Sequence, residues 1–210
     1  MAELVTDLDP AVIRGNLELV RERAGAGVEI LAATKYVPLE EMGALAEAGV
    51  TLVGENRLQD LEAKRERWGD AFAWDFIGAL QSRKVKRIVP AVRLIHSLAS
   101  DSALDQLERH RQADTEVLVQ VNLAGEESKS GIAPAALEDF IARCPVRVSG
   151  LMTMPPATDD PEASRPYFAR LAELAAEQGL ERLSMGTSQD WTAAVEEGAT
   201  IIRLGSGLYR

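Results

Sequence analysis

The chain has 210 residues, a formal net charge of −10 at pH 7 and a single cysteine, Cys144. The length suits one domain over residues 1–210, and the acidic balance argues against a nucleic-acid binder, which usually displays a basic surface. One cysteine excludes an intrachain disulfide and a multi-thiolate metal site, and no apolar run approaches the roughly 20 residues of a membrane helix. We therefore expect a cytoplasmic protein that binds neither nucleic acid nor membrane. Nothing in the sequence demands a dimer, so we expect a monomer.

The first predicted element is a helix over Pro10–Ala24. Asp9 is suited to cap it, Pro10 fits its first turn, and Gly25 is suited to end it. The acidic segment before it, which includes Glu3, lacks the positive charge and long apolar stretch of a secretory signal.

Eight short strand-like segments follow and alternate with helical segments. The predicted strands cover 28–34, 51–53, 73–77, 93–96, 116–123, 146–151, 182–184 and 200–204. The predicted helices between them cover 39–48, 57–68, 82–89, 102–112, 134–143, 161–178 and 190–197. This alternation predicts a parallel sheet, and eight repeats predict an α/β fold closed into a single (β/α)₈ TIM-type barrel.

Few residues follow the eighth strand, so we expect the helix over 10–24 to cover that side of the barrel in place of a final helix. The alternative is an open doubly wound sheet, which would need a Gly-rich phosphate turn after its first strand. The four residues there, 33–36, include no glycine.

Barrel enzymes place their active sites at the carboxyl ends of the strands, where Lys35 follows the first strand. Partial burial in the barrel mouth would lower the pKa of this lysine and let a neutral amine form an imine with an aldehyde. On this pattern alone, a lysine at a strand end that extends to solvent is the more ordinary interpretation. If strand alternation continues, Tyr36 points away from Lys35.

The loops after strands seven and eight are rich in Gly, Ser and Thr, over residues 184–188 and 205–207. Barrels often bind phosphate at these two loops through backbone N–H groups and hydroxyls, although two ordinary turns would have the same composition. An amine and a phosphate-binding loop in one site together indicate that the ligand is a phosphorylated aldehyde. Composition does not decide between pyridoxal 5′-phosphate (PLP) and the sugar phosphates of Schiff-base aldolases.

Eight stretches in order resemble the pyridoxal phosphate homeostasis protein family. They are LAATKYVP (31–38), VGENRLQD (53–60), WDFIGALQSRKVK (74–86), IHSLAS (95–100), VQVNLAGEESKSGI (119–132), GLMTMPP (150–156), LSMGTSQDW (183–191) and IIRLGSGLY (201–209). The resemblance covers nearly the whole chain after residue 28. It implies a barrel like the N-terminal domain of alanine racemase, and a PLP-binding protein that sequesters the cofactor and supplies it to PLP-dependent apoenzymes.

The resemblance also implies a set of cofactor-binding residues, with PLP held as a Schiff base on Lys35. Arg203 is expected to face the pyridine nitrogen, Asn56 to lie near the cofactor and Met152 to contact it. Ser184, Gly205 and Ser206 are expected to hold the phosphate, with Thr187 and Ser188 as further contacts. Two positions depart from the family pattern: Ala79 replaces a larger residue, which leaves the lining of that part of the mouth open, and Ser206 replaces Thr but keeps the hydroxyl.

A guanidinium opposite the ring nitrogen weakens PLP as an electron sink, because Arg203 cannot accept that nitrogen's proton. A racemase with this arrangement also needs a second base, which related racemases take from an extra domain for which we expect no room here. The candidate bases are Tyr36, Tyr167, Tyr209, His96 and His110, and His96 is more often a satisfied core residue. We therefore expect a carrier and not an enzyme, with a weak PLP-dependent amino-acid racemase as the alternative.

Overall fold

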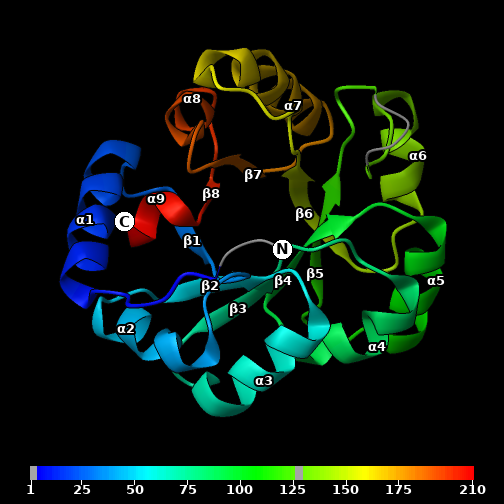
Figure 1. Cartoon of the computed structure of the whole chain (residues 1–210). Helices are drawn as coiled ribbons and strands as arrows, with labels where there is room; N and C mark the ends of the chain where they lie inside the picture. The colour runs from blue at the N-terminus through cyan, green and yellow to red at the C-terminus, as the bar shows by residue number, and fades with distance from the viewer. Residues whose placement is uncertain (1–3, 126–129) are drawn as a thin grey trace.

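The computed structural model describes residues 4–125 and 130–210. Eight parallel strands close into a barrel in the order β1 to β8, and β1 pairs with both β2 and β8 (Figure 1). This confirms the predicted barrel, and the open doubly wound sheet is wrong because the sheet has no edge. The strands are β1 (Glu29–Ala33), β2 (Leu52–Glu55), β3 (Ala73–Phe76), β4 (Leu94–Leu98), β5 (Glu116–Gln120), β6 (Arg147–Met152), β7 (Arg182–Thr187) and β8 (Ile201–Leu204).

Helices form a ring around the barrel (Figure 1). The α-helices are α1 (Pro10–Ala24), α2 (Met42–Glu47), α3 (Leu58–Trp68), α4 (Val85–Ile88), α5 (Asp101–His110), α6 (Leu137–Ala142), α7 (Arg165–Glu177), α8 (Trp191–Glu196) and α9 (Ser206–Tyr209). Short 3₁₀ turns η1 (Leu39–Glu41), η2 (Ser82–Lys84), η3 (Val89–Ala91), η4 (Pro134–Ala136) and η5 (Pro161–Ser164) adjoin them. In the part of the chain that is described, none of the helices has the length and apolar character needed to cross a bilayer.

Both ends of α1 follow the predicted capping. The carboxylate of Asp9 accepts a hydrogen bond from the backbone N–H of Ala11, and Gly25 ends the helix with a φ of 84°. The buried face of α1 is formed by Ile13, Leu17 and Val20. The spacing of these apolar residues is that of one helix face, which places α1 against the barrel.

A short helix after β8 was not expected. The four residues of α9 pack against α1, and the side-chain amide of Asn16 donates to the carbonyls of Leu208 (3.2 Å) and Arg210 (3.0 Å). The prediction that α1 alone covers this side is therefore wrong. A single turn of helix is too short for hydrophobic periodicity to reveal.

Strand β7 runs to Thr187, three residues beyond its predicted end at Ser184. The sequence there favours a turn because of Gly186, whose φ is 87°. A Cβ on Gly186 would lie 2.6 Å from the Cβ of Ala194, so glycine is needed where α8 approaches the strand. This extension moves Ser184 from a mouth loop into the barrel wall.

The barrel interior contains apolar and polar side chains. Its apolar members are Leu31, Ala33, Leu52, Leu94, Leu118, Met152 and Ile201. His96 lies two residues after Leu94, and Arg203 lies two residues after Ile201, so alternation places these polar side chains inside the barrel as well. The larger apolar core lies between the strands and the surrounding helices.

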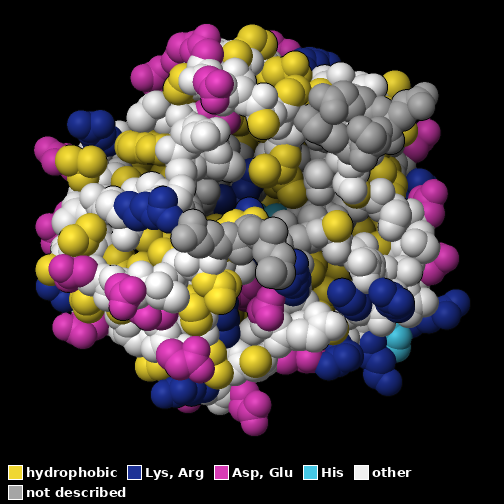
Figure 2. Space-filling model, viewed as in Figure 1, with side chains coloured by type: hydrophobic (Ala, Val, Ile, Leu, Met, Phe, Trp, Pro, Cys, Tyr) yellow, Lys and Arg dark blue, Asp and Glu magenta, His cyan; other side chains and the backbone are white. Residues whose placement is uncertain are grey.

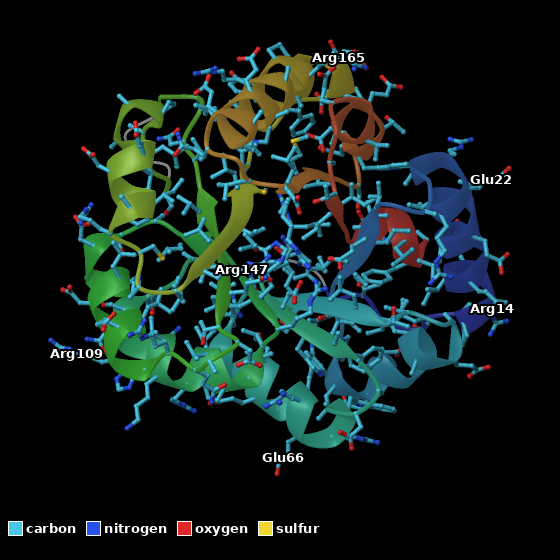
Figure 3. All side chains as sticks on the ribbon, turned by 180° about the vertical axis from the view of Figure 1, so that it is seen from behind. Arg14, Glu22, Glu66, Arg109, Arg147 and Arg165 are labelled. Atoms are coloured by element: carbon cyan, nitrogen blue, oxygen red, sulfur yellow. The ribbon has the colours of Figure 1, made fainter. Side chains whose placement is uncertain are left out.

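Ion pairs lie at the opposite end of the barrel, which Figure 3 shows from behind. Arg93 pairs with Glu29 (2.8 Å) and Asp75 (2.8 Å), and Arg147, near the middle of the face shown, pairs with Glu116 (2.9 Å). Arg147 and Glu116 begin the neighbouring strands β6 and β5, whereas Arg93, just before β4, reaches across the barrel to Glu29 at the start of β1.

Candidate cofactor-binding site

A cavity of about 500 Å³ opens at the carboxyl ends of the strands. Figure 2 shows this mouth as a hollow at the centre of the face, with Lys or Arg side chains inside it. The predicted residues that line it are Lys35, Asn56, Met152, Thr187, Ser188, Arg203, Gly205 and Ser206. The lining also includes Val5, Ala33, Tyr36, Ile77, Gly78, Met154, Gln189, Tyr209 and Arg210, of which the sequence offered Tyr36 and Tyr209 as candidate bases.

Lys35 lies in the turn that follows β1, and its side chain is exposed, so the partial burial expected from the sequence is not observed. Its Nζ atom lies 5.1 Å from the centre of the Tyr36 ring, and both residues line the cavity. The expectation that Tyr36 points away from Lys35 is therefore wrong. Strand β1 ends at Ala33, so its alternation does not continue to these positions.

The backbone beside Lys35 is held by two neighbouring elements. Lys64 of α3 donates to the carbonyl of Thr34 (2.7 Å) and to the carboxylate of Glu55 (2.5 Å), and all three residues are buried. Tyr209 of α9 donates its hydroxyl to the carbonyl of Ala33 (3.0 Å). Burial raises the pKa of Glu55, against the opposing attraction of Lys64. The backbone around Lys35 is thus anchored, while its exposed side chain is not enclosed by protein.

Backbone donors converge on a serine on the other side of the cavity. The hydroxyl oxygen of Ser188 accepts hydrogen bonds from the N–H groups of Gly205 (3.0 Å) and Gly207 (3.1 Å). A Cβ on Gly207 would lie 3.0 Å from the Cβ of Ser188, so the glycine allows this close approach. These two N–H groups fix the Ser188 oxygen and leave its hydroxyl proton available to donate to a phosphate oxygen.

Ser184 does not line the cavity, although the family resemblance implied that it holds the phosphate. It is fully buried in β7, where its hydroxyl meets Nη1 of Arg203 at 2.5 Å and Nδ1 of His96 at 2.8 Å. The difference follows from the longer strand, which turns this side chain into the barrel interior. Ser188, four residues later, reaches the mouth instead.

Arg203 is 6% exposed and has only neutral acceptors in direct contact. Its Nη2 atom donates to the carbonyl of Thr153 (3.0 Å) and to the sulfur of Met154 (2.9 Å), and Nη1 donates to Ser184. Burial lowers the pKa of Arg203 to about 10, so the guanidinium keeps its charge at neutral pH. Of its five N–H donors, Nε and one at Nη1 have no protein acceptor among the described residues, and they belong to a side chain that lines the cavity.

The remaining wall contains Asn56 and Met152. The side-chain oxygen of Asn56 is buried and has no hydrogen-bond partner in the described ranges. A Cβ on Gly78 would lie 2.1 Å from the carbonyl oxygen of Asn56, so glycine is required where the ends of β2 and β3 meet. Ala79 is exposed and is not part of the lining, which Ile77 and Gly78 supply at this position.

The remaining candidate residues from the sequence do not line the cavity. His96 is fully buried with both ring nitrogens in hydrogen bonds, as expected for a core histidine. Among residues 4–125 and 130–210, no cluster of His, Cys, Asp or Glu is arranged to hold a metal ion. Residues 126–129, within the motif at 119–132, lie outside the described residues.

The chain matches the family model for the alanine racemase N-terminal domain over residues 8–210. It is 40% identical over 205 residues to the pyridoxal phosphate homeostasis protein of Aquifex aeolicus, with 90% of each sequence covered. The chain belongs to the pyridoxal phosphate homeostasis protein family.

Solved structures agree with this family. PipY of Synechococcus elongatus PCC7942, solved with PLP bound, superposes with a TM-score of 0.84 at 31% identity, covering 94% of this chain and 100% of that one. Alanine racemase of Corynebacterium glutamicum shares the fold with a TM-score of 0.76 at 16% identity, and 63% of its chain is covered. The homeostasis family thus uses the barrel that alanine racemase combines with further chain.

Proposed function

We propose that this protein binds PLP as a Schiff base on Lys35 and acts in intracellular PLP homeostasis, by sequestering the cofactor and supplying it to apoenzymes. The observation that carries the proposal is one cavity that brings together the amine of Lys35, the guanidinium of Arg203 and the N–H groups at Ser188. An amine, an anion cradle and a donor for a ring nitrogen match the aldehyde, the phosphate and the pyridine nitrogen of PLP. Its membership of the homeostasis family supports this role.

The residues present fit the cofactor by their chemistry. The hydroxyl of Ser188, oriented by the N–H groups of Gly205 and Gly207, and the hydroxyl of Ser206 would hold the phosphate. Arg203 would donate to the pyridine nitrogen. Met152, which is 3% exposed, would contact the ring, and the unpartnered oxygen of Asn56 would accept a hydrogen bond near it. When bound, PLP supplies an aldehyde that forms a Schiff base and a ring that withdraws electrons.

Arg203 supports storage over catalysis. A guanidinium that remains charged cannot take up the proton of a pyridinium, so the ring nitrogen stays unprotonated and withdraws electrons less strongly. We propose that the protein acts in the cytoplasm as a monomer, where one chain supplies every group in the cavity. Covalent attachment to Lys35 would keep a reactive aldehyde from other amines until an apoenzyme accepts it.

One observation favours a second function, a weak amino-acid racemase. Tyr36 lies in the same cavity as Lys35, with the Lys35 Nζ atom 5.1 Å from the centre of its ring, and could serve as a second proton donor or acceptor. Racemisation needs such a group on the face of the substrate opposite the lysine.

Two measurements on the PLP-loaded protein decide between these functions. A carrier transfers PLP to a PLP-dependent apoenzyme and restores its activity, and it leaves the Cα hydrogen of alanine unexchanged in deuterium oxide. Exchange at a catalytic rate that is lost in Tyr36→Phe would establish the racemase instead. Failure to restore any apoenzyme, with no exchange, would contradict both functions.

A further inference from the structure

A continuous line of hydrogen-bonded polar groups runs through the barrel from Arg93 to Arg203, and the residues between these two arginines are buried. It begins with Arg93, which donates from Nε and Nη2 to the two carboxylate oxygens of Asp75 (3.0 and 2.8 Å). His96 Nε2 lies 3.0 Å from Asp75, His96 Nδ1 lies 2.8 Å from the hydroxyl of Ser184, and Ser184 meets Arg203 at 2.5 Å. Asp75, His96 and Ser184 are at most 3% exposed, so no solvent interrupts the line.

The chemistry of the two ends fixes the direction of every hydrogen bond between them. Arginine only donates, so the Ser184 oxygen accepts from Arg203 and its single proton goes to Nδ1 of His96. Because Nδ1 then accepts, the proton of a neutral imidazole is on Nε2 and is donated to Asp75.

The charges agree with this arrangement. Burial alone would raise the pKa of Asp75, but hydrogen bonds from His96 and Arg93 outweigh it and hold this pKa below its usual value, so Asp75 is ionised. Burial lowers the pKa of His96, against the attraction of Asp75, so the imidazole is neutral. Only one tautomer of a neutral His96 can satisfy both neighbours.

The same three residue types form the catalytic triad of serine hydrolases, but the geometry here excludes that use. A nucleophilic serine must reach a substrate, and its oxygen must be free to attack. The Ser184 oxygen is fully buried, accepts from Arg203 and does not line the cavity. Its contacts are directed to Arg203 and not to a substrate.

We propose that Asp75, His96 and Ser184 are positioning residues for Arg203, which aim its guanidinium into the cavity and connect it to a buried carboxylate. Burial of a cation is costly, and the direct acceptors of Arg203, Ser184, Thr153 and Met154, are neutral. The carboxylate of Asp190 attracts the guanidinium through space without a hydrogen bond to it. The hydrogen bonds through His96 and Ser184 are polarised by the charge of Asp75, and this polarisation stabilises the guanidinium of Arg203. This inference rests on the proposed function only in that Arg203 is taken to face the pyridine nitrogen.

The first test needs no cofactor. Nitrogen-15 NMR of the PLP-free protein, with the His96 signals assigned by comparison with His110→Gln, reports which ring nitrogen carries the proton. The expected result at pH 7 is a neutral ring with the proton on Nε2. A proton on Nδ1, or a doubly protonated ring, would overturn the directed chain.

The second test uses Ser184→Ala in the presence of PLP. We expect PLP binding to weaken about tenfold, as for a lost hydrogen bond to a charged group, and the pH midpoint of the bound cofactor's absorption band to shift. Ser149→Ala is the matched control, because Ser149 is a buried serine on β6 whose hydroxyl has no partner in the described residues. It should leave both readouts within about twofold of the parent.

Ser184→Thr, which keeps the hydroxyl, should recover both readouts. Equal behaviour of Ser184→Ala and Ser149→Ala would overturn the proposal even though PLP binds. If Ser184→Ala does not fold, Ser184→Cys replaces it, because the slightly larger thiol leaves no cavity but forms only weak hydrogen bonds. Absence of PLP binding by the parent protein would instead refute the proposed function, and the NMR result would still decide whether the chain exists.

Discussion

At the residue scale, the site depends on which side chains at the carboxyl ends of the strands line the cavity. Lys35, Arg203 and Ser188 reach the same cavity from β1, β8 and the turn after β7. The sequence could not show whether Ser184 lies in a strand or in a loop. A serine in a Gly-containing segment has the composition of a phosphate-binding loop in either position. Only the length of β7 separates the two cases.

The substitution Ser188→Ala tests the phosphate cradle. It removes the acceptor shared by the N–H groups of Gly205 and Gly207 and one hydroxyl donor to the phosphate. We expect PLP to bind about tenfold more weakly, in line with a lost hydrogen bond to a charged group. Pyridoxal, which has no phosphate, should bind as it does to the parent protein. An equal loss for pyridoxal and PLP, measured by absorbance titration, would place Ser188 away from the phosphate.

At the element scale, the number, order and closure of the strands could be predicted, because eight apolar segments alternate with amphipathic ones and parallel neighbours require this alternation. The residues at which the elements end could not be predicted. The one-turn α9 leaves no periodic signal, yet its Tyr209 fixes the end of β1. The buried pair of Lys64 and Glu55, which attaches α3 to the same place, also escapes the sequence, because both residues are usually exposed.

The attachment of α3 can be tested by a double-mutant cycle. Glu55→Gln leaves the ammonium of Lys64 buried without its anion and should lower the free energy of unfolding by about 3 kcal/mol. Lys64→Met should also destabilise the protein, whereas the double substitution should recover a large part of the loss because neither charge remains. Urea unfolding of the three variants measures this. Penalties that simply add would show that the two charges do not stabilise one another.

At the scale of the whole molecule, a barrel with ion pairs at one end and an open cavity at the other is joined through its interior by Asp75, His96 and Ser184. We propose that residues 1–210 act as one such unit. Because the pKa of Asp75 is held below its usual value, its ionisation stabilises the fold above the unfolded pKa of about 3.9. That contribution is lost as the pH falls through the lower, folded pKa.

The substitution Asp75→Asn should therefore have a cost that depends on pH. Above about pH 5 we expect a loss of roughly 3 kcal/mol in the free energy of unfolding, since Arg93 and His96 lose a buried anionic partner. The difference from the parent protein should shrink as the pH falls below about 4, where Asp75 in the unfolded parent is protonated. Urea unfolding across this range measures it. A penalty that stays constant would mean that the carboxylate charge contributes nothing.

The most direct test of the central claim is borohydride reduction of the protein with PLP, followed by peptide mass mapping. A Schiff base is reduced to a stable pyridoxyl adduct, which we predict on the peptide that contains Lys35 and not on those with other lysines. Lys35→Ala should fold as the parent does and carry no adduct. An adduct on another lysine, or persistence of the imine absorption in Lys35→Ala, would contradict the assignment of Lys35 as the cofactor anchor.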